Sequence, residues 1–174
     1  MFYIQASNPV NNSEYDINDT KIMEAIETIF PMRTEMVIMV WNHICIPLSY
    51  KYDISYMVDD IINILKELVA KKEGCIKVNW LPDTFCCQWV VKWKENIVKI
   101  SAIWNNVIGD ILEPLNSNSD ISMNKFDFIN EWEQVFYNIK KALQECGYND
   151  INLEDMSQLI QINSLFTNKG ILYQ

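Results

Sequence analysis

Residues 75–105 read CIKVNWLPDTFCCQWVVKWKENIVKISAIWN, and this stretch decides the fold. Apolar and polar side chains alternate from Ile76 to Trp80, as they do in a strand with one buried face. The alternation resumes after the turn signal Leu81-Pro82-Asp83 and again after Lys94-Glu95-Asn96. The stretch therefore predicts an antiparallel meander of three strands.

Two further strands are predicted ahead of the meander. The runs 36–41 and 44–48 are apolar and rich in β-forming residues, with Asn42-His43 as the turn between them. Pro47 marks the second run as an edge strand, because proline has no N–H to donate to a neighbour. Residues 1–18 are polar and Asn-rich after a short apolar start, which is typical of a loop.

Two long amphipathic helices complete the pattern. Over 53–73 the apolar residues share one face, so Asp53 is expected as the N-cap and Gly74 as the residue after the C-terminus. The second helix is predicted over 125–146, between Asn124 and Gly147 in the same two roles. Shorter helices are expected over 19–30 and 153–161, a polar loop over 109–120, and a turn at Gly170.

The tryptophans divide into two groups by position. Four of them fall on apolar faces and are expected in the core: Trp89, Trp93, Trp104 and Trp132. Trp41 and Trp80 stand at strand ends, where we expect exposed edges. Since 49% of the 174 residues are hydrophobic, the chain has ample material for one packed core. The prediction is a single α+β domain over 1–174, its antiparallel or mixed sheet packed against the two long helices.

Composition excludes several classes of function. The net charge is −9 and Arg33 is the only arginine, whereas nucleic-acid binders need clustered cations and favour arginine. We therefore expect no nucleic-acid partner. No apolar run reaches the roughly 18 residues of a membrane span, so no membrane partner is expected. The N-terminus lacks the basic start and apolar stretch of a secretory signal, which favours a cytoplasmic protein.

No motif for catalysis or cofactor binding is present in the sequence. His43 is the only histidine and has no recognisable nucleophile beside it, so a surface turn is the expected setting. Glycines do not recur within a few residues, which rules out a phosphate-binding loop. The five cysteines have no metal-ligand spacing and are expected to be reduced and mostly buried. We therefore expect no enzyme activity, no cofactor and no metal site.

The remaining signal is negative charge. Between residues 110 and 155 ten acidic residues stand against three lysines, a net charge of −7 in about a quarter of the chain. Ordinary solubility accounts for such a surface, and so does the steering of a basic partner into contact. Our candidate partner-binding residues are those expected on a loop or an exposed helix face: Asp110, Glu113, Asp120, Asp127 and Glu131.

The order of these elements resembles that of bacterial immunity proteins, which neutralise toxins of contact-dependent growth inhibition and related polymorphic toxin systems. The resemblance covers about 36–147 and lies in layout and composition. It is carried by Trp41-Asn42-His43-Ile44, Pro47-Leu48-Ser49-Tyr50-Lys51-Tyr52-Asp53, the Trp-rich meander, and Phe126-Asp127-Phe128-Ile129-Asn130-Glu131-Trp132. It implies a cytoplasmic inhibitor that occludes a cognate toxin, expected to be a basic protein such as a nuclease. Two other classes stay open: an adaptor or regulatory module, and a hydrolase or transferase without a readable motif.

Overall fold

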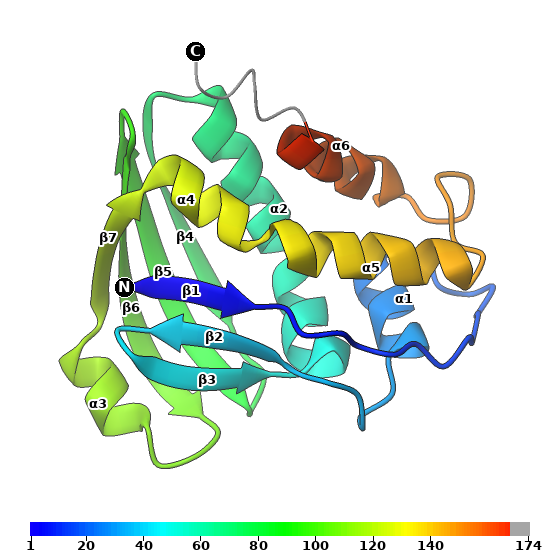
Figure 1. Cartoon of the computed structure of the whole chain (residues 1–174), viewed down its shortest axis with the longest axis horizontal. Coiled ribbons are helices and arrows are strands. Elements are labelled where there is room, and N and C mark those ends of the chain that lie inside the picture. The colour runs from blue at the N-terminus through cyan, green and yellow to red at the C-terminus, as the bar shows by residue number, and fades with distance from the viewer. Residues whose placement is uncertain (168–174) are drawn as a thin grey trace.

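In residues 1–167, which the computed structural model describes, the strands form two antiparallel sheets (Figure 1). Sheet A has the order β1-β2-β3, and sheet B has the order β4-β5-β6-β7. The strands of sheet A are β1 (Phe2–Gln5), β2 (Val37–Trp41) and β3 (Ile44–Leu48). Those of sheet B are β4 (Glu73–Trp80), β5 (Phe85–Lys94), β6 (Ile97–Val107) and β7 (Asp120–Asn124).

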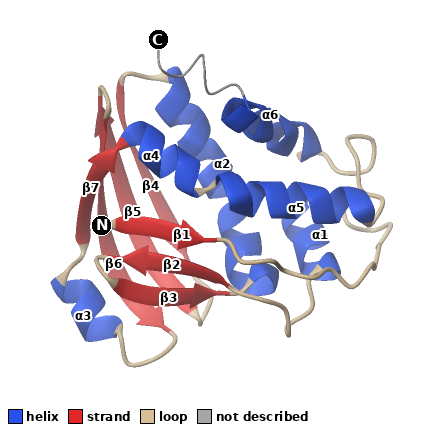
Figure 2. Ribbon diagram, in the orientation of Figure 1, coloured by secondary structure: helices blue, strands red, loops and turns tan. Residues whose placement is uncertain are grey.

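The larger helices lie beside the sheets, on one side of the molecule (Figure 2). Helix α2 packs against β4 and α1, and α5 packs against α1 and α6. One hydrophobic cluster runs through both sheets and these helices, so the predicted single α+β domain is confirmed. The helical elements are α1 (Ile22–Ile29), the π-turn η1 (Tyr50–Ile54), α2 (Ser55–Ala70), α3 (Leu112–Ser117), α4 (Lys125–Glu131), α5 (Glu133–Glu145) and α6 (Met156–Thr167).

The predicted meander is confirmed as β4, β5 and β6, but sheet B has a fourth strand. Strand β7 and helix α3 occupy part of the segment that we expected to be a loop over 109–120. The Asn116 side chain accepts a hydrogen bond from the Trp104 N–H at 3.2 Å and donates one to the Trp104 carbonyl at 3.0 Å. These bonds to β6 hold a polar segment in place. They cannot be predicted from the periodicity of the sequence.

The second difference is that the strands divide between two sheets. The short apolar start of the chain is strand β1, whose alternating Phe2 and Ile4 face the core. Trp41 of β2 contacts Trp89 of β5 with ring centroids 5.2 Å apart, so the inner faces of the sheets meet at tryptophans. The expectation that Trp41 and Trp80 are exposed is therefore wrong, because both are buried in this seam. The four tryptophans predicted in the core are buried as expected.

The first long helix begins differently from the prediction. Ser49, and not Asp53, is the N-cap: its side chain accepts a hydrogen bond from the Tyr52 N–H, and the π-turn η1 leads into α2. Gly74 is not the residue after the helix but lies in β4. A Cβ at Gly74 would come within 2.2 Å of the Trp93 ring, so glycine is needed there for space.

The second long helix is two helices, α4 and α5, that meet at Trp132. The Trp132 N–H bonds the Ile129 carbonyl, three residues back, in place of the four-residue spacing of an α-helix. Both predicted ends are confirmed: Asn124 caps α4 through the Phe126 N–H, and Gly147 follows α5 with φ of +96°. The turn expected at Gly170 lies outside the described residues. No helix within residues 1–167 combines the length and apolarity that crossing a bilayer requires.

Candidate functional site

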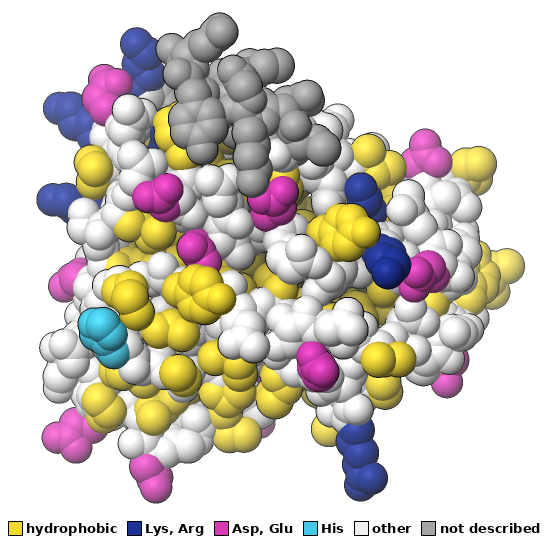
Figure 3. Space-filling view, viewed as in Figure 1, with side chains coloured by type: hydrophobic (Ala, Val, Ile, Leu, Met, Phe, Trp, Pro, Cys, Tyr) yellow, Lys and Arg dark blue, Asp and Glu magenta, His cyan; other side chains and the backbone are white. Residues whose placement is uncertain are grey.

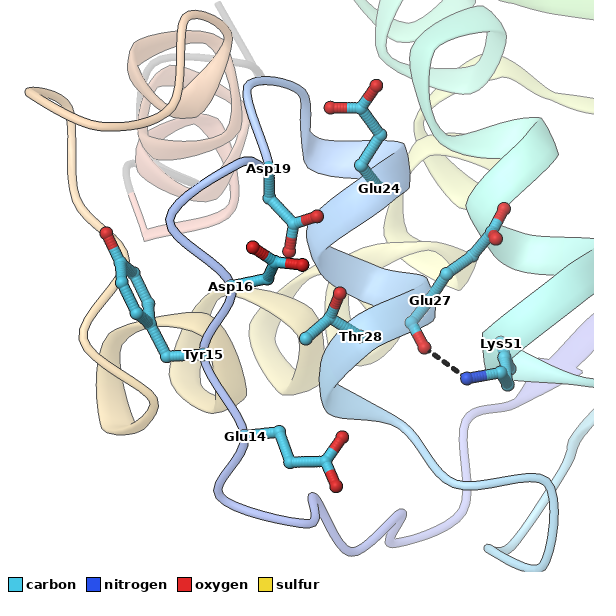
Figure 4. Close-up of a pocket in the computed structure, with 8 residues that line it drawn as sticks. All are labelled: Glu14, Tyr15, Asp16, Asp19, Glu24, Glu27, Thr28 and Lys51. Carbon is cyan, nitrogen blue, oxygen red and sulfur yellow. Dashed lines mark hydrogen bonds between the residues drawn. The ribbon is translucent and has the colours of Figure 1, made fainter.

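Five acidic side chains line a hollow of about 640 Å³ (Figure 4). Its walls are the loop of residues 14–19, helix α1 and the beginning of η1. Figure 4 shows side chains from the loop and from α1 directed toward the same space. We call this feature the acidic hollow, and it is lined by Glu14, Tyr15, Asp16, Asp19, Glu24, Glu27, Thr28 and Lys51.

A buried tyrosine holds the loop wall of the hollow in place. The Tyr148 hydroxyl donates a hydrogen bond to the Asp19 carboxylate and accepts one from the Asp16 N–H at 3.0 Å. The Tyr15 ring packs on the Tyr148 ring with centroids 4.7 Å apart. Burial is the main reason that the pKa of Tyr148 is raised to about 12, so its hydroxyl stays protonated. The Asp19 carboxylate and the backbone of the loop at Asp16 are therefore held in a defined position.

The helix wall is fixed by capping. The Glu24 carboxylate accepts hydrogen bonds from the backbone N–H groups of Thr20 at 2.8 Å and Lys21 at 3.1 Å. These bonds lower the pKa of Glu24, because they stabilise the charged form. Glu24 thus closes the first turn of α1 while it keeps its negative charge at the rim of the hollow.

The negative charge of the hollow is not balanced by ion pairs. Lys51 is its one lining cation, and the Lys51 ammonium donates to the Glu27 backbone carbonyl rather than to a carboxylate. Within the described chain, ion pairs join Lys71 to Glu67 and Lys141 to Glu145, and all four lie outside the lining. The hollow presents five carboxylates to solvent with little internal compensation.

Negative charge continues from the hollow onto α2. Burial raises the pKa of Asp59 most, and the neighbouring charges of Asp155 and Asp60 raise it further. Lys21 acts in the opposite direction. Asp60 accepts a hydrogen bond from the Trp80 indole at 2.9 Å, so its carboxylate also anchors α2 to β4. The electrostatic potential of this end of the molecule is therefore negative beyond the lining residues themselves.

The five candidate residues from the sequence do not form one cluster. Asp110 and Glu113 are exposed at α3, and Asp127 is exposed on α4, at the other end of β7 (Figure 1). Asp120 is exposed on β7 and accepts a hydrogen bond from the Ser101 hydroxyl. We call these four residues the α3–α4 edge. On the face drawn in Figure 3, acidic side chains are scattered among apolar and uncharged ones.

Glu131 does not have the exposed position that we expected. Its carboxylate accepts a hydrogen bond from the backbone N–H of Ile4 at 2.8 Å, at the outer edge of β1. Burial raises the pKa of Glu131, the Ile4 hydrogen bond opposes this shift, and the charge of Asp127 adds to it. The structural role arises because α4 lies along the edge of sheet A, a contact between residues 127 positions apart.

His43 occupies the surface turn predicted for it. Asn42 and His43 have φ of +47° and +70°, the left-handed conformation of a two-residue hairpin turn between β2 and β3. The His43 side chain is exposed. The cysteines are all free thiols, but only Cys87 is buried, while Cys45 and Cys75 are exposed, so the expectation of mostly buried thiols is wrong. Cys45 and Cys75 lie on strands β3 and β4, respectively.

The residues of the acidic hollow were missed because charge was counted where the acids were most numerous, over 110–155. A shorter window contains the signal: five acidic residues and one lysine lie between residues 14 and 27. Among residues 1–167, no group of three or more acidic, histidine or cysteine side chains is arranged to hold a metal ion. No protein-family model, curated protein or solved structure matches the chain.

Proposed function

We propose that this chain is a non-catalytic binding protein that neutralises a basic toxin, as the bacterial immunity proteins that it resembles in layout do. The proposal places it in the cytoplasm and assigns it no cofactor. The observation that carries it is the acidic hollow, which is lined by five residues with carboxylates, none of them ion-paired. A lysine or arginine side chain of a partner would supply the missing charge.

The surroundings of the hollow suit a protein partner. Tyr15, Tyr52 and Tyr56 are exposed, and tyrosine is one of the residues enriched in binding surfaces because its ring offers contact area and its hydroxyl a polar tip. Tyr52 lies next to Lys51 in η1, and Tyr56 follows one turn later in α2. Contact on these rings around a seated cationic side chain would cover the basic site of the toxin and keep its substrate out.

Long-range charge gives this mechanism a kinetic signature. The net charge of −9 draws a basic partner toward the protein, and salt screens that attraction over about 8 Å at physiological ionic strength. We expect the association rate to fall steeply with salt, while the dissociation rate changes less. An interface dominated by apolar contacts would show neither effect.

The experiment compares two matched charge reversals against the product of the gene that neighbours this one. Glu14→Lys with Glu27→Lys changes the hollow, and Asp110→Lys with Glu113→Lys changes the α3–α4 edge by the same total charge. None of these four side chains carries a hydrogen bond that shapes the hollow or α3. We expect the first variant to lose binding and protection of cells from the toxin, and the second to slow association only modestly.

Either of two results would overturn this assignment. Loss of binding in the α3–α4 variant, with the hollow variant unaffected, would move the interface to Asp110, Glu113, Asp120 and Asp127. Unchanged binding in both variants, or no interaction with the neighbouring gene product, would favour an adaptor or an enzyme over a toxin inhibitor. Circular dichroism of each variant checks that the fold is retained.

A further inference from the structure

Three of the four outer sheet edges carry a feature that blocks the addition of another strand. Pro47 removes an N–H from the free edge of β3, and the Glu131 carboxylate occupies the Ile4 N–H at the free edge of β1. On β7 the Asn42 amide donates to the Asp120 carbonyl at 2.9 Å. Within the described residues, β4 is therefore the one outer strand without such a feature.

Strand β4 is an eight-residue edge with no such protection. Among residues 1–167, the backbone N–H and C=O groups of Glu73–Trp80 bond only to β5. The Glu95 N–H donates to the Lys72 carbonyl at 2.7 Å, which identifies Lys72 and Glu95 as a hydrogen-bonded pair. Because the pattern alternates, the backbone groups of Glu73, Cys75 and Lys77 point to the free edge.

The side chains of this edge are self-complementary. Glu73 and Lys77 lie two residues on either side of Cys75, and all three are exposed on the same face of sheet B. In an antiparallel pair of identical strands centred on Cys75, Glu73 of each copy stands opposite Lys77 of the other. A two-fold axis through such a pair produces two equal ion pairs from one strand sequence.

We infer that β4 is a dimerisation edge, at which a second copy of this chain adds its own β4 in antiparallel fashion, with Cys75 on the two-fold axis. The two sheets B then join into one continuous sheet. The free N–H and C=O groups of Glu73, Cys75 and Lys77 are all paired in this arrangement. Ile76, which is only half-buried at the open edge, comes to lie opposite Gly74 of the second copy.

Charge also excludes the neighbouring registers. Side chains on opposed strands must share a face, so the centre moves in steps of one residue; Gly74 and Ile76 are the next centres, and Lys77 follows Ile76. A centre at Gly74 opposes Glu73 to Cys75 and forms no ion pair. A centre at Lys77 sets the two Lys77 side chains against each other, which is unfavourable. A centre at Ile76 opposes Lys77 to Cys75 and forms no ion pair. Only the centre at Cys75 pairs Glu73 with Lys77.

The test is a charge swap read by sedimentation velocity at high protein concentration. Glu73→Lys alone and Lys77→Glu alone each place like charges opposite one another, and we expect the dimerisation constant to fall by roughly tenfold or more. An equimolar mixture of the two variants restores both ion pairs and regains the dimer. Lys99→Glu is the matched control, because Lys99 is exposed on the same face but lies on β6, two strands from the edge.

Copper–phenanthroline oxidation in air supplies an independent readout of the register. Two Cys75 thiols on the axis should form a disulfide between copies, which Cys75→Ser abolishes and Cys45→Ser leaves intact. A monomeric wild type, a mixture that fails to regain the dimer, or cross-linking through Cys45 instead would each overturn the inference. The toxin-binding proposal does not depend on any of these results, because its hollow lies on α1 and η1.

Discussion

The Glu131 carboxylate receives the backbone N–H of Ile4 at 2.8 Å and so joins the end of helix α4 to the first strand of the chain. Glu131 is half-buried, and this burial penalises its charged form and raises its pKa. The contact nevertheless satisfies a backbone donor that has no neighbouring strand. The raised pKa of Glu131 makes the stability of the protein depend on pH.

Stability should fall as the pH rises above the ordinary range of a carboxyl group. The folded protein holds a proton on Glu131 more tightly than the unfolded chain does, so deprotonation between the two pKa values favours unfolding. Glu131→Gln keeps an oxygen acceptor for Ile4 and has no charge to desolvate, so it should flatten this part of the profile. Urea unfolding from about pH 4 to pH 8 measures the effect, with the exposed Asp110→Asn as control. A steeper profile in Glu131→Gln would contradict the assignment.

Asp53 should be required for the π-turn that begins α2. Its buried carboxylate accepts the Ser49 N–H at 2.7 Å and the Thr84 hydroxyl at 2.5 Å, and burial raises its pKa. Asp53→Ala leaves both donors without a partner and should cost about 2–3 kcal/mol of unfolding free energy. Asp53→Asn retains an acceptor oxygen and should cost clearly less. Equal losses in the two variants would mean that volume, not hydrogen bonding, matters there.

Gly74→Ala should destabilise the protein through contact with Trp93. The added Cβ would lie 2.2 Å from Cζ2 of the Trp93 ring, and the Trp93 indole is held by a hydrogen bond to the Lys71 carbonyl at 3.0 Å. We expect a cost of about 1–3 kcal/mol, typical of overpacking. In the Trp93→Phe background the clashing ring atoms are absent, so the same change should cost less. An additive double-mutant cycle would show that the ring is not the cause.

Trp41→Phe should cost more than Trp104→Phe, although the two rings are in contact and both are buried. The Trp41 indole donates to the Asn118 carbonyl at 2.8 Å, whereas the Trp104 indole N–H has no partner among residues 1–167. The lost volume is the same, so the difference of about 1 kcal/mol reports the hydrogen bond. Thermal unfolding of the two single variants and of the double variant, which completes a double-mutant cycle, measures this difference in unfolding free energy. Equal losses of stability in the two single variants would contradict the prediction that the Trp41 hydrogen bond contributes.

Elements that depend on local pattern were predictable from the sequence. Alternation in 75–105 located β4, β5 and β6, because each strand buries one face and exposes the other. Asn124 and Gly147 were found because capping needs particular residue types at helix ends.

Features that depend on distant contacts were not predictable. The division into two sheets, the break at Trp132 and the placement of Glu131 all follow from packing between segments far apart in the chain. The Asn-rich sequence of the α3 segment is typical of a loop, and the bonds from Asn116 to the Trp104 backbone that order it do not show in the local pattern. The acidic hollow escaped for the same reason: its loop acquires a shape only through Tyr148.

That anchoring has a consequence for synthesis. The loop of residues 14–19 leaves the ribosome early, yet Tyr148, which fixes it, is made more than a hundred residues later. A nascent chain that carries every lining residue of the hollow still lacks its geometry until the segment after α5 has emerged and packed. The shape of the hollow is therefore acquired late in synthesis, and translation products that end before Tyr148 would lack it.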